Sequence, residues 1–173
     1  KGNELIYHFA AHVDIGGSVL NPQKTIEDNM KTTINVLEVC RKFDISLVFP
    51  SSGSIYGDSL VPLTEYDLLN PYNPYSASKT SLDRICYAYQ KCYGLDVKIV
   101  RLFNPYGPNQ KQSFVVPYFC TQALSNQPIT VFGDGNDTRD FVYISDVIRG
   151  FWEVRNLDGG EVVNLASNIA TTT

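Results

Sequence analysis

The sequence contains no run of the roughly 20 consecutive apolar residues that a membrane-spanning helix needs. Its first residues lack the charged-then-apolar pattern of an export signal. Basic residues are not in excess, because 14 Lys and Arg stand against 18 Asp and Glu, for a net charge of −4. Such a chain is not expected to bind nucleic acid or a membrane through nonspecific charge. These absences, with a length of 173 residues, predict a cytoplasmic protein of one compact domain or one and a fraction.

Cysteine pairs at metal-binding spacing are also missing. The four cysteines form no C-x-x-C, and three lie in apolar, helix-like surroundings, so we interpret them as buried free thiols; a disulfide or a zinc site is the alternative. His8 and His12 have a strand-to-loop placement that gives no reason for a shared metal. We therefore expect no metal site.

The glycine-rich phosphate-binding fingerprint of a dinucleotide fold is absent as well. Neither G-x-G-x-x-G nor G-x-x-G-x-x-G occurs: Gly16-Gly17 lacks the third glycine, and Gly133-x-Gly135 leads into a turn. The chain also opens on a strand. We infer that the first half of its sheet is missing.

Strand and helix patterns alternate over the part of the chain that is present. Strands are expected at 4–11, at 45–50 with a stop at Pro50, and at 97–103; helices are expected at 25–43 and at 77–93, the second ending at Gly94. Continuous apolar strands, each followed by a helix, predict an α/β fold that is part of a doubly wound parallel, Rossmann-like sheet.

After residue 108 the pattern changes. We expect a helix at 115–125, a strand at 129–133, a tight turn, a strand at 140–144, a helix capped by Ser145 and running to about 156, a strand at 161–166, and a helix start at 167–173. The predicted organisation is the second half of a Rossmann-like domain at 1–108, part of a substrate-binding lobe at 109–138, and a strand–helix–strand segment at 139–173 that returns toward the first domain.

Tyr75 and Lys79 could carry acid/base chemistry. At i and i+4 they share one helix face, and a cation beside a phenol would lower the pKa of the tyrosine toward neutral pH. Such a tyrosine can exchange a proton with a sugar hydroxyl. Tyr87 and Lys91 repeat the spacing in mid-helix, where it indicates an ordinary helix face. Only Tyr75 stands at a helix entrance.

Ser52 could work with Tyr75. It follows a buried strand, at the sheet edge where open α/β folds bind ligands. There its hydroxyl could relay or donate a proton between a substrate hydroxyl and Tyr75. Ordinary strand-end turn chemistry is the alternative.

Five motifs occur in order: HFAA at 8–11, SSGSIYG at 51–57, NPYSASK at 73–79, RLFNPYGP at 101–108 and GDGNDTRDFVYISDV at 133–147. Together they resemble the extended short-chain dehydrogenase/reductase family, in particular its nucleotide-sugar 4-epimerases and dehydratases. The resemblance covers essentially the whole chain and begins at what would be the family's fourth strand. It implies NAD as cofactor, a nucleotide-sugar substrate such as a UDP-sugar, and a homodimer formed through the two long helices.

The resemblance also implies roles for individual residues. Tyr75 would be the acid/base, Lys79 its electrostatic partner and ribose ligand, and Ser52 the group that orients the hydroxyl. Besides Tyr75 and Lys79, the cofactor would be lined by Phe9, Ala10, Ala11, Asn29, Pro50, Ser51 and Phe103. Besides Ser52, the substrate would be bound by Asn104, Val115, Thr130, Phe132 and Arg139. For Arg139 a local ion pair with Asp137 or Asp140 is the alternative to diphosphate binding.

The activity implied is 4-epimerisation through transient oxidation to a keto-sugar, part of carbohydrate metabolism. Dehydratase relatives carry an Asp-Glu pair, or at least a Glu, directly after the Ser52 position. Gly53 and Ser54 occupy those places here, which favours an epimerase over a dehydratase or a reductase. The alternative of another class is a catalytically inert fragment or binding module, because the glycine-rich pyrophosphate site is absent.

Overall fold

The computed structural model describes residues 4–59 and 62–172. Leu60 and Val61 of the predicted loop, and Thr173, lie outside this description. The chain divides into two compact units. The first comprises Lys1–Leu102 with Gly150–Leu165, and the second comprises Phe103–Arg149 with Ala166–Thr173. Each unit is described by itself.

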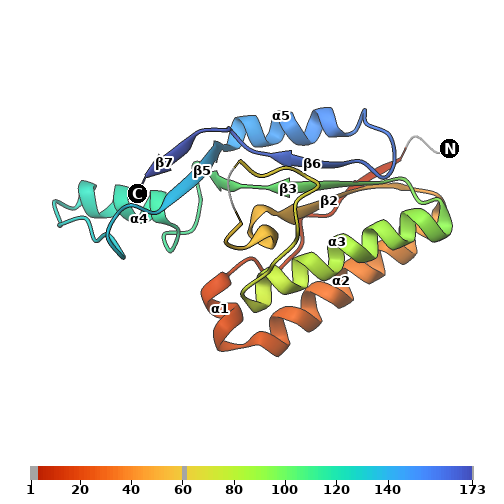
Figure 1. The fold of residues 1–173 in the computed structure, drawn as a ribbon, viewed down its shortest axis with the longest axis horizontal. Helices are drawn as coiled ribbons and strands as arrows, with labels where there is room; N and C mark the ends of the chain where they lie inside the picture. Colours follow the sequence, from red (N-terminus) through yellow and green to blue (C-terminus); the bar gives the residue numbers. More distant parts are fainter. Residues whose placement is uncertain (1–3, 60–61, 173) are drawn as a thin grey trace. The chain divides into compact units, whose positions relative to one another are not determined.

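A parallel sheet of four strands forms the centre of the first unit (Figure 1). In spatial order its strands are β1 (Leu5–Tyr7), β2 (Ser46–Ser52), β3 (Val97–Leu102) and β6 (Val162–Leu165). All three neighbouring pairs are parallel, with Val48 opposite Tyr7 and Lys98, and Val100 opposite Val163. The predicted α/β fold with a parallel Rossmann-like sheet is confirmed.

Two long helices, α2 (Pro22–Phe43) and α3 (Pro74–Tyr93), lie side by side on one face of this sheet (Figure 1). Each begins with a proline directly after an asparagine cap, and the Asn73 side chain accepts the Ser76 N–H at 2.8 Å. The predicted stop of α3 at Gly94 is confirmed by its left-handed φ of 66°. The short helix α1 (Ile15–Leu20) precedes α2.

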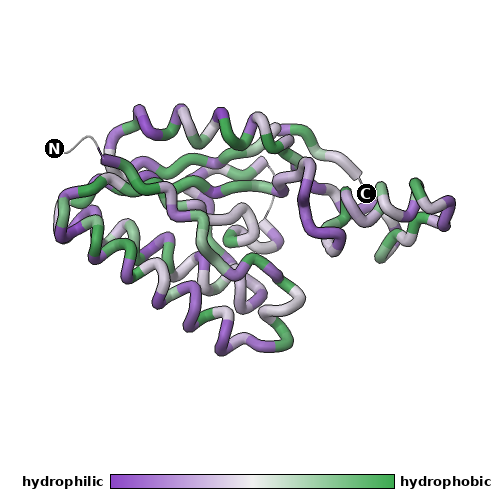
Figure 2. The backbone as a smooth tube through the Cα atoms, turned by 180° about the vertical axis from the view of Figure 1, so that it is seen from behind, coloured by the Kyte–Doolittle hydropathy of each residue, from purple (hydrophilic) through white to green (hydrophobic). Residues whose placement is uncertain are grey.

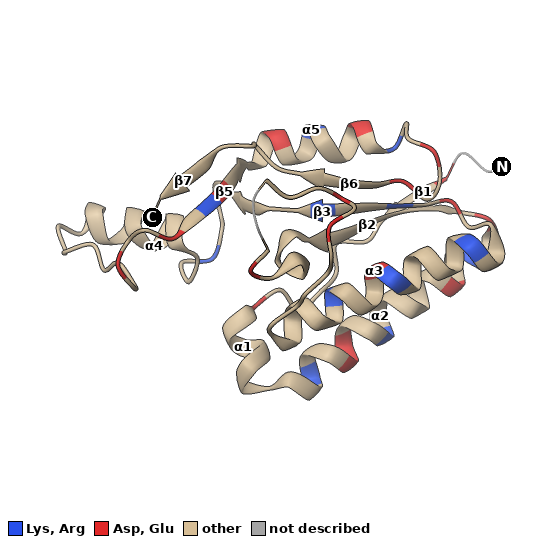
Figure 3. Ribbon diagram, in the orientation of Figure 1, with Lys and Arg blue, Asp and Glu red and all other residues tan. Residues whose placement is uncertain are grey.

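The core of the first unit lies between the sheet and these helices. Figure 2 shows apolar colour along the central strands and alternating colour along the helices, and Figure 3 shows charges of both signs spread over α2 and α3. The buried cluster comprises Leu37, Cys40, Leu47, Phe49, Leu82, Cys86, Leu95, Val97 and Ile99. On the other face, Gly150 allows the end of α5 (Ile144–Val154) to approach β6, because a Cβ there would lie 2.5 Å from Leu165 Cδ1.

The expected end of the second strand at Pro50 is wrong. β2 continues to Ser52 and pairs with β3 along this stretch, with Pro50 opposite Val100. The missing proline N–H is tolerated because the pairing of β2 with β1 ends at Val48. The strand therefore carries Ser51 and Ser52 to the edge of the sheet.

The second unit contains a three-stranded sheet of order β4-β5-β7. Its strands are β4 (Asn104–Tyr106), β5 (Thr138–Tyr143) and β7 (Ala170–Thr172), accompanied by α4 (Val115–Leu124) and the start of α5. β5 runs parallel to β4 and antiparallel to β7. α5 begins at Ile144, directly after β5, so the predicted cap at Ser145 lies inside the helix and the predicted end near 156 falls at Val154.

Two further expectations for the second unit are wrong. Residues 129–133 form no strand, because the polar groups of Thr130 pair with the Gln122 side chain of α4 instead of a neighbouring strand. The segment after β6 forms β7 and not a helix. The Asp140 carboxylate accepts the N–H groups of Ser167 and Asn168, each at 2.7 Å, which turns the chain back along β5.

The cysteines fit the prediction in part. All four are free, and Cys40 and Cys86 are buried between α2 and α3 as expected. Cys92 and Cys120 are exposed, because each lies on the outer side of its helix. Burial raises the pKa of the Cys40 and Cys86 thiols, so both stay protonated at neutral pH.

Candidate active site

The carboxyl end of β2 supplies the first part of the site. Ser52 ends the strand and caps the short 3₁₀ helix η1 (Gly53–Tyr56), with its Oγ accepting the Ser54 N–H at 3.2 Å. Ser54 Oγ lies 2.9 Å from Ser52 Oγ. Ser52 therefore lies at the ligand-binding edge of a parallel sheet, with its hydroxyl held in a local network.

The first turn of α3 supplies the second part. Tyr75 is the second residue of the helix and is buried, with 7% of its surface exposed. Its N–H, which has no partner within the helix, donates to Ser18 Oγ of α1 at 3.2 Å. Ser18 in turn donates to Ile15 O, so α1 fixes the start of α3 and with it Tyr75.

Tyr75 and Ser52 come together, as the sequence predicts. Burial raises the pKa of Tyr75, and a hydrogen-bonding interaction with the Ser52 side chain lowers it in part. This net rise is opposite to the expected lowering by Lys79. Tyr75 is therefore a neutral phenol at neutral pH in this state, and the interaction with Ser52 favours its phenolate.

Lys79 turns toward the sheet instead of toward the phenol. Its Nζ donates to Pro50 O at 2.8 Å and lies 5.0 Å from the centre of the Phe49 ring. Only 4% of its surface is exposed, and burial lowers its pKa from 10.5 to about 8. The side chain thus carries a buried ammonium without a carboxylate partner among the described residues.

Asn29 organises the segment that follows β1. Its side-chain amide accepts the His12 N–H at 2.7 Å and donates to His12 O and to Ser78 Oγ, both at 3.1 Å. Asn29 is 1% exposed and ties this segment to α3. Asn29 is predicted to line the cofactor. In the structure both the oxygen and the nitrogen of its amide bond to His12 or Ser78, so Asn29 supports the site.

The other cofactor candidates of the first unit follow the strand ends. Phe9 is 58% exposed and packs edge-on against Phe151 at 4.9 Å, while Ala10 and Ala11 continue from it into the loop. Pro50 and Ser51 are buried in β2. All of these lie on the same unit as Ser52, Tyr75 and Lys79.

The remaining candidates all belong to the second unit. They are Phe103, Asn104, Val115, Thr130, Phe132 and Arg139. The amide of Asn104 donates to Asp140 O at 2.9 Å, and Phe132 is 77% exposed. Arg139 lies 3.7 Å from Asp137, the local ion pair that the sequence left open, but both groups are exposed and the pair is weak.

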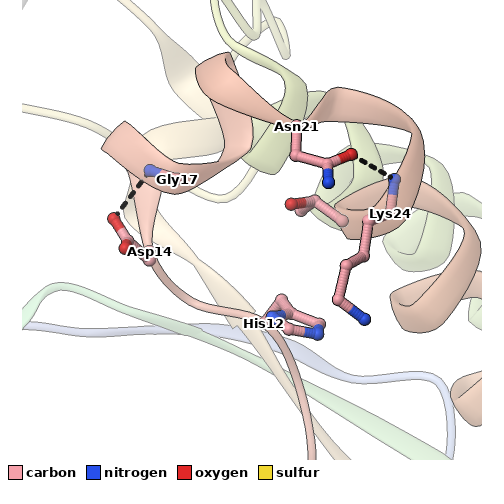
Figure 4. Close-up of a pocket in the computed structure, with 6 residues that line it drawn as sticks. His12, Asp14, Gly17, Asn21 and Lys24 are labelled. Carbon is pink, nitrogen blue, oxygen red and sulfur yellow. Dashed lines mark hydrogen bonds between the residues drawn. The ribbon is translucent and has the colours of Figure 1, made fainter.

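A small polar pocket of about 160 Å³ lies apart from these residues, where α1 meets α2 (Figure 4). Asp14 accepts the Gly17 N–H and Asn21 accepts the Lys24 N–H, so two lining residues serve as helix caps. His12 Nε2 lies 2.9 Å from Asp28 Oδ2. His8 directly follows β1, and its Nε2 lies 3.1 Å from Thr33 Oγ1. These contacts account for both histidines without a shared ligand.

Comparison with known proteins identifies the family. The sequence profile described as "NAD dependent epimerase/dehydratase family" matches residues 1–166. This chain belongs to that family. It is 35% identical to the UDP-glucuronate 4-epimerase of Thermodesulfobacterium geofontis, over 90% of this chain and 51% of that protein.

Solved structures of the family superpose closely. The UDP-glucuronic acid 4-epimerase of Bacillus cereus, in complex with UDP-glucuronic acid and NAD, matches with a TM-score of 0.92 and 31% identity, over 98% of this chain and 55% of that one. The dTDP-glucose 4,6-dehydratase DesIV of Streptomyces venezuelae matches with a TM-score of 0.91 and 32% identity, over 99% and 54%. The chain spans about half the length of these relatives.

The residues of the first unit fit NAD, the cofactor of the family. An ammonium has three donors, and Lys79 uses one of them, on Pro50 O, among the described residues. The Ser51 hydroxyl is buried and has no hydrogen-bond partner in the part of the chain that the structure describes. Buried polar groups are almost always paired, so these two groups are suited to ribose and nicotinamide polar atoms.

Three serines that the sequence did not single out complete the site. Ser18 holds the start of α3, Ser76 donates to Ser54 Oγ at 3.2 Å, and Ser54 contacts Ser52. In the sequence, Ser54 is notable only because it stands where dehydratase relatives carry a carboxylate. The density of serines at 51–54 and 76–81 is a signal that could have drawn attention to Ser54 and Ser76, whereas Ser18 carries no such signal.

Proposed function

We propose that the protein containing this chain is an NAD-dependent nucleotide-sugar 4-epimerase acting on a UDP-hexose-like substrate. One observation carries the proposal: Ser52 interacts with Tyr75, one helical turn before buried Lys79, and the turn after Ser52 supplies no carboxylate. The first feature provides for proton exchange with a sugar hydroxyl. The second means that the turn lacks the acid that elimination of water would require.

The cofactor and three residues of the chain would have separate roles in the reaction. NAD, held by groups such as Lys79 and Ser51, would supply the reversible hydride transfer at the sugar carbon. Tyr75 takes the proton of the hydroxyl on that carbon and later gives it back, and Ser52 orients that hydroxyl. Lys79, held by Pro50 O, would bind the ribose, and its positive charge one helical turn from Tyr75 would favour the phenolate form.

The turn after Ser52 separates this protein from its dehydratase relatives. The fold does not separate them, because the TM-scores of 0.92 and 0.91 are nearly equal. Gly53 has no side chain, and the Ser54 hydroxyl is bound to Ser52 and Ser76. Neither can protonate a leaving hydroxyl, so the keto-sugar is reduced again instead of losing water.

Product analysis tests this function. The complete protein, incubated with UDP-glucose and separately with UDP-glucuronate, is expected to give the 4-epimer of at least one, with no net change in NADH absorbance. A 4-keto-6-deoxy product would contradict the assignment in favour of a dehydratase. Steady consumption or production of NADH would contradict it in favour of a reductase.

The remaining parts of the proposal concern assembly and placement. We propose a cytoplasmic homodimer paired through α2 and α3, which expose Val39, Phe43, Tyr87 and Tyr93. Within the described residues, no helix is long and apolar enough to cross a membrane.

Residues 1–108 would complete the NAD-binding domain. Residues 109–138 would belong to the substrate lobe, where Val115, Thr130 and Phe132 would bind the nucleoside. Asn104 and Arg139, which flank this range, would bind the diphosphate. Residues 139–173 would return to the first domain.

A further inference from the structure

The side chain of Ser54 lies between the two elements that build the site. Its Oγ is 2.9 Å from Ser52 Oγ at the end of β2 and 3.2 Å from Ser76 Oγ in α3, the residue after Tyr75. Ser76 is fully buried, whereas Ser52 and Ser54 are half-buried. With the Tyr75 hydroxyl beside Ser52, four hydroxyls form a chain that begins and ends on the first turn of α3.

The donors and acceptors of this chain restrict the direction of each bond. A serine hydroxyl has one proton and two lone pairs. Ser52 Oγ already accepts the Ser54 N–H at 3.2 Å. When Ser54 Oγ donates to it as well, both lone pairs of Ser52 are engaged, and the Ser52 proton must point to another acceptor. In the substrate-free site the oxygen of Tyr75, whose side chain interacts with that of Ser52, can accept this proton.

Ser76 sets the direction from the other end. Its hydroxyl donates to Ser54 Oγ, so Ser54 has an occupied lone pair and its own proton is free for Ser52. The order of donation is then Ser76 to Ser54, Ser54 to Ser52, and Ser52 to Tyr75. When Tyr75 is a neutral phenol it can donate to Ser52, and the Ser52–Ser54 bond can reverse, because either oxygen can be the donor.

We propose that Ser54 is a positioning residue that turns the Ser52 hydroxyl into a hydrogen-bond donor to the Tyr75 phenolate, and that Ser76 holds Ser54 in that role. The proposal rests on the function proposed above, because it takes Tyr75 as the acid/base. Burial opposes the phenolate, and a donor aimed at its oxygen offsets that cost. Ser54 thus acts on the reaction through Ser52 and needs no contact with the sugar.

The test is the titration of Tyr75 in the complete, NAD-loaded protein without substrate, followed by NMR of tyrosine labelled with ¹³C at Cζ and assigned with Tyr75→Phe. Ser54→Ala is expected to raise the pKa of Tyr75. The acid limb of the kcat/KM profile, which reports the substrate-free enzyme, should move to higher pH. Below the pKa, kcat/KM should fall roughly tenfold, as loss of one hydrogen bond to a charged group predicts.

Three further variants serve as checks. Ser54→Thr keeps the hydroxyl and should restore both the titration and the pH profile. Ser76→Ala should shift both in the same direction by less, because the Ser54 hydroxyl remains and can still donate to Ser52. It also serves as the test if Ser54→Ala does not fold. Ser81→Ala is the matched control, since Ser81 is an exposed serine of α3 whose side chain, within the described part of the chain, bonds only to Ala77 O.

The outcomes separate this inference from the proposed function. An unchanged Tyr75 titration and pH profile in Ser54→Ala, or in Ser76→Ala where that variant replaces it, would overturn the inference while leaving Tyr75 as the acid/base. Loss of kcat at all pH values with an unchanged titration would also overturn it. Full turnover in Tyr75→Phe would instead refute the proposed function, whatever the titration shows.

Discussion

Two buried cations of the first unit, Lys79 and Arg101, have opposite surroundings. Arg101 of β3 is 1% exposed, and its guanidinium donates to both carboxylate oxygens of Asp83, to the Tyr56 hydroxyl and to Glu65 O. Lys79 of α3 is 4% exposed, and among residues 4–59 and 62–172 it donates to a single carbonyl. One cation is fully paired, and the other is left with unused donors.

The difference indicates what each cation does. Arg101 links β3, α3 and the segment after η1, and all its contacts are made within the protein, so its role is structural. Lys79 is held with a lowered pKa and with donors to spare, a costly arrangement that proteins keep where a ligand completes it. The fold is thus stabilised by one buried charge and strained by the other.

Breaking the Arg101 pair is expected to have the largest effect on stability. Asp83→Ala leaves the guanidinium buried without its carboxylate, which should lower the free energy of unfolding by about 3–5 kcal/mol. Urea denaturation of the complete protein measures the loss. Asp146→Ala is the matched control, because Asp146 pairs with the exposed Arg149 and its loss should cost less than about 1 kcal/mol. Equal effects of the two variants would show that Arg101 is not the structural cation.

Removing the charge of Lys79 should have the reverse sign. The folded-state pKa of about 8 lies below the ordinary value of 10.5, so the charged form is disfavoured by burial at pH 7. Lys79→Met should therefore raise the free energy of unfolding of the NAD-free protein, by on the order of 3 kcal/mol at most, while it abolishes turnover. A loss of stability would place Lys79 with Arg101 as a structural residue.

The pH dependence of stability sharpens the same prediction. Because the folded pKa of Lys79 is the lower one, the unfolded chain binds more protons between pH 8 and 10.5. Stability should then rise with pH over the lower part of this window and stay level in Lys79→Met. Parallel curves for the two proteins would contradict the assignment of this titration to Lys79.

The sequence predicted the parts of the fold that depend on local pattern. The helical repeat and the proline and glycine signals placed α2 and α3 to within a few residues. Two errors, the strand at 129–133 and the helix at 167–173, arose where a side chain outside the segment determines its conformation. Gln122 takes the polar groups of Thr130, and Asp140 turns the segment that becomes β7.

The same limit applies to the site. Ser52 and Tyr75 could be paired from their motifs, but the Tyr-Lys spacing predicted a contact that the structure does not make. Lys79 turns to Pro50 O because β2 continues past the proline that was expected to end it. The supporting serines were missed because their contacts join distant parts of the chain: Ser18 accepts the Tyr75 N–H, and Ser54 contacts Ser52 and Ser76. No single-sequence pattern links them.

The central claim is that Tyr75 is the acid/base of a nucleotide-sugar 4-epimerase. The most direct measurement is turnover of the UDP-sugar by Tyr75→Phe in the complete protein, with bound NAD quantified in the same sample. Loss of the phenolic oxygen should lower kcat by roughly 10²- to 10⁴-fold while the NAD content stays close to that of the wild type. Turnover within a few fold of the wild type would contradict the account.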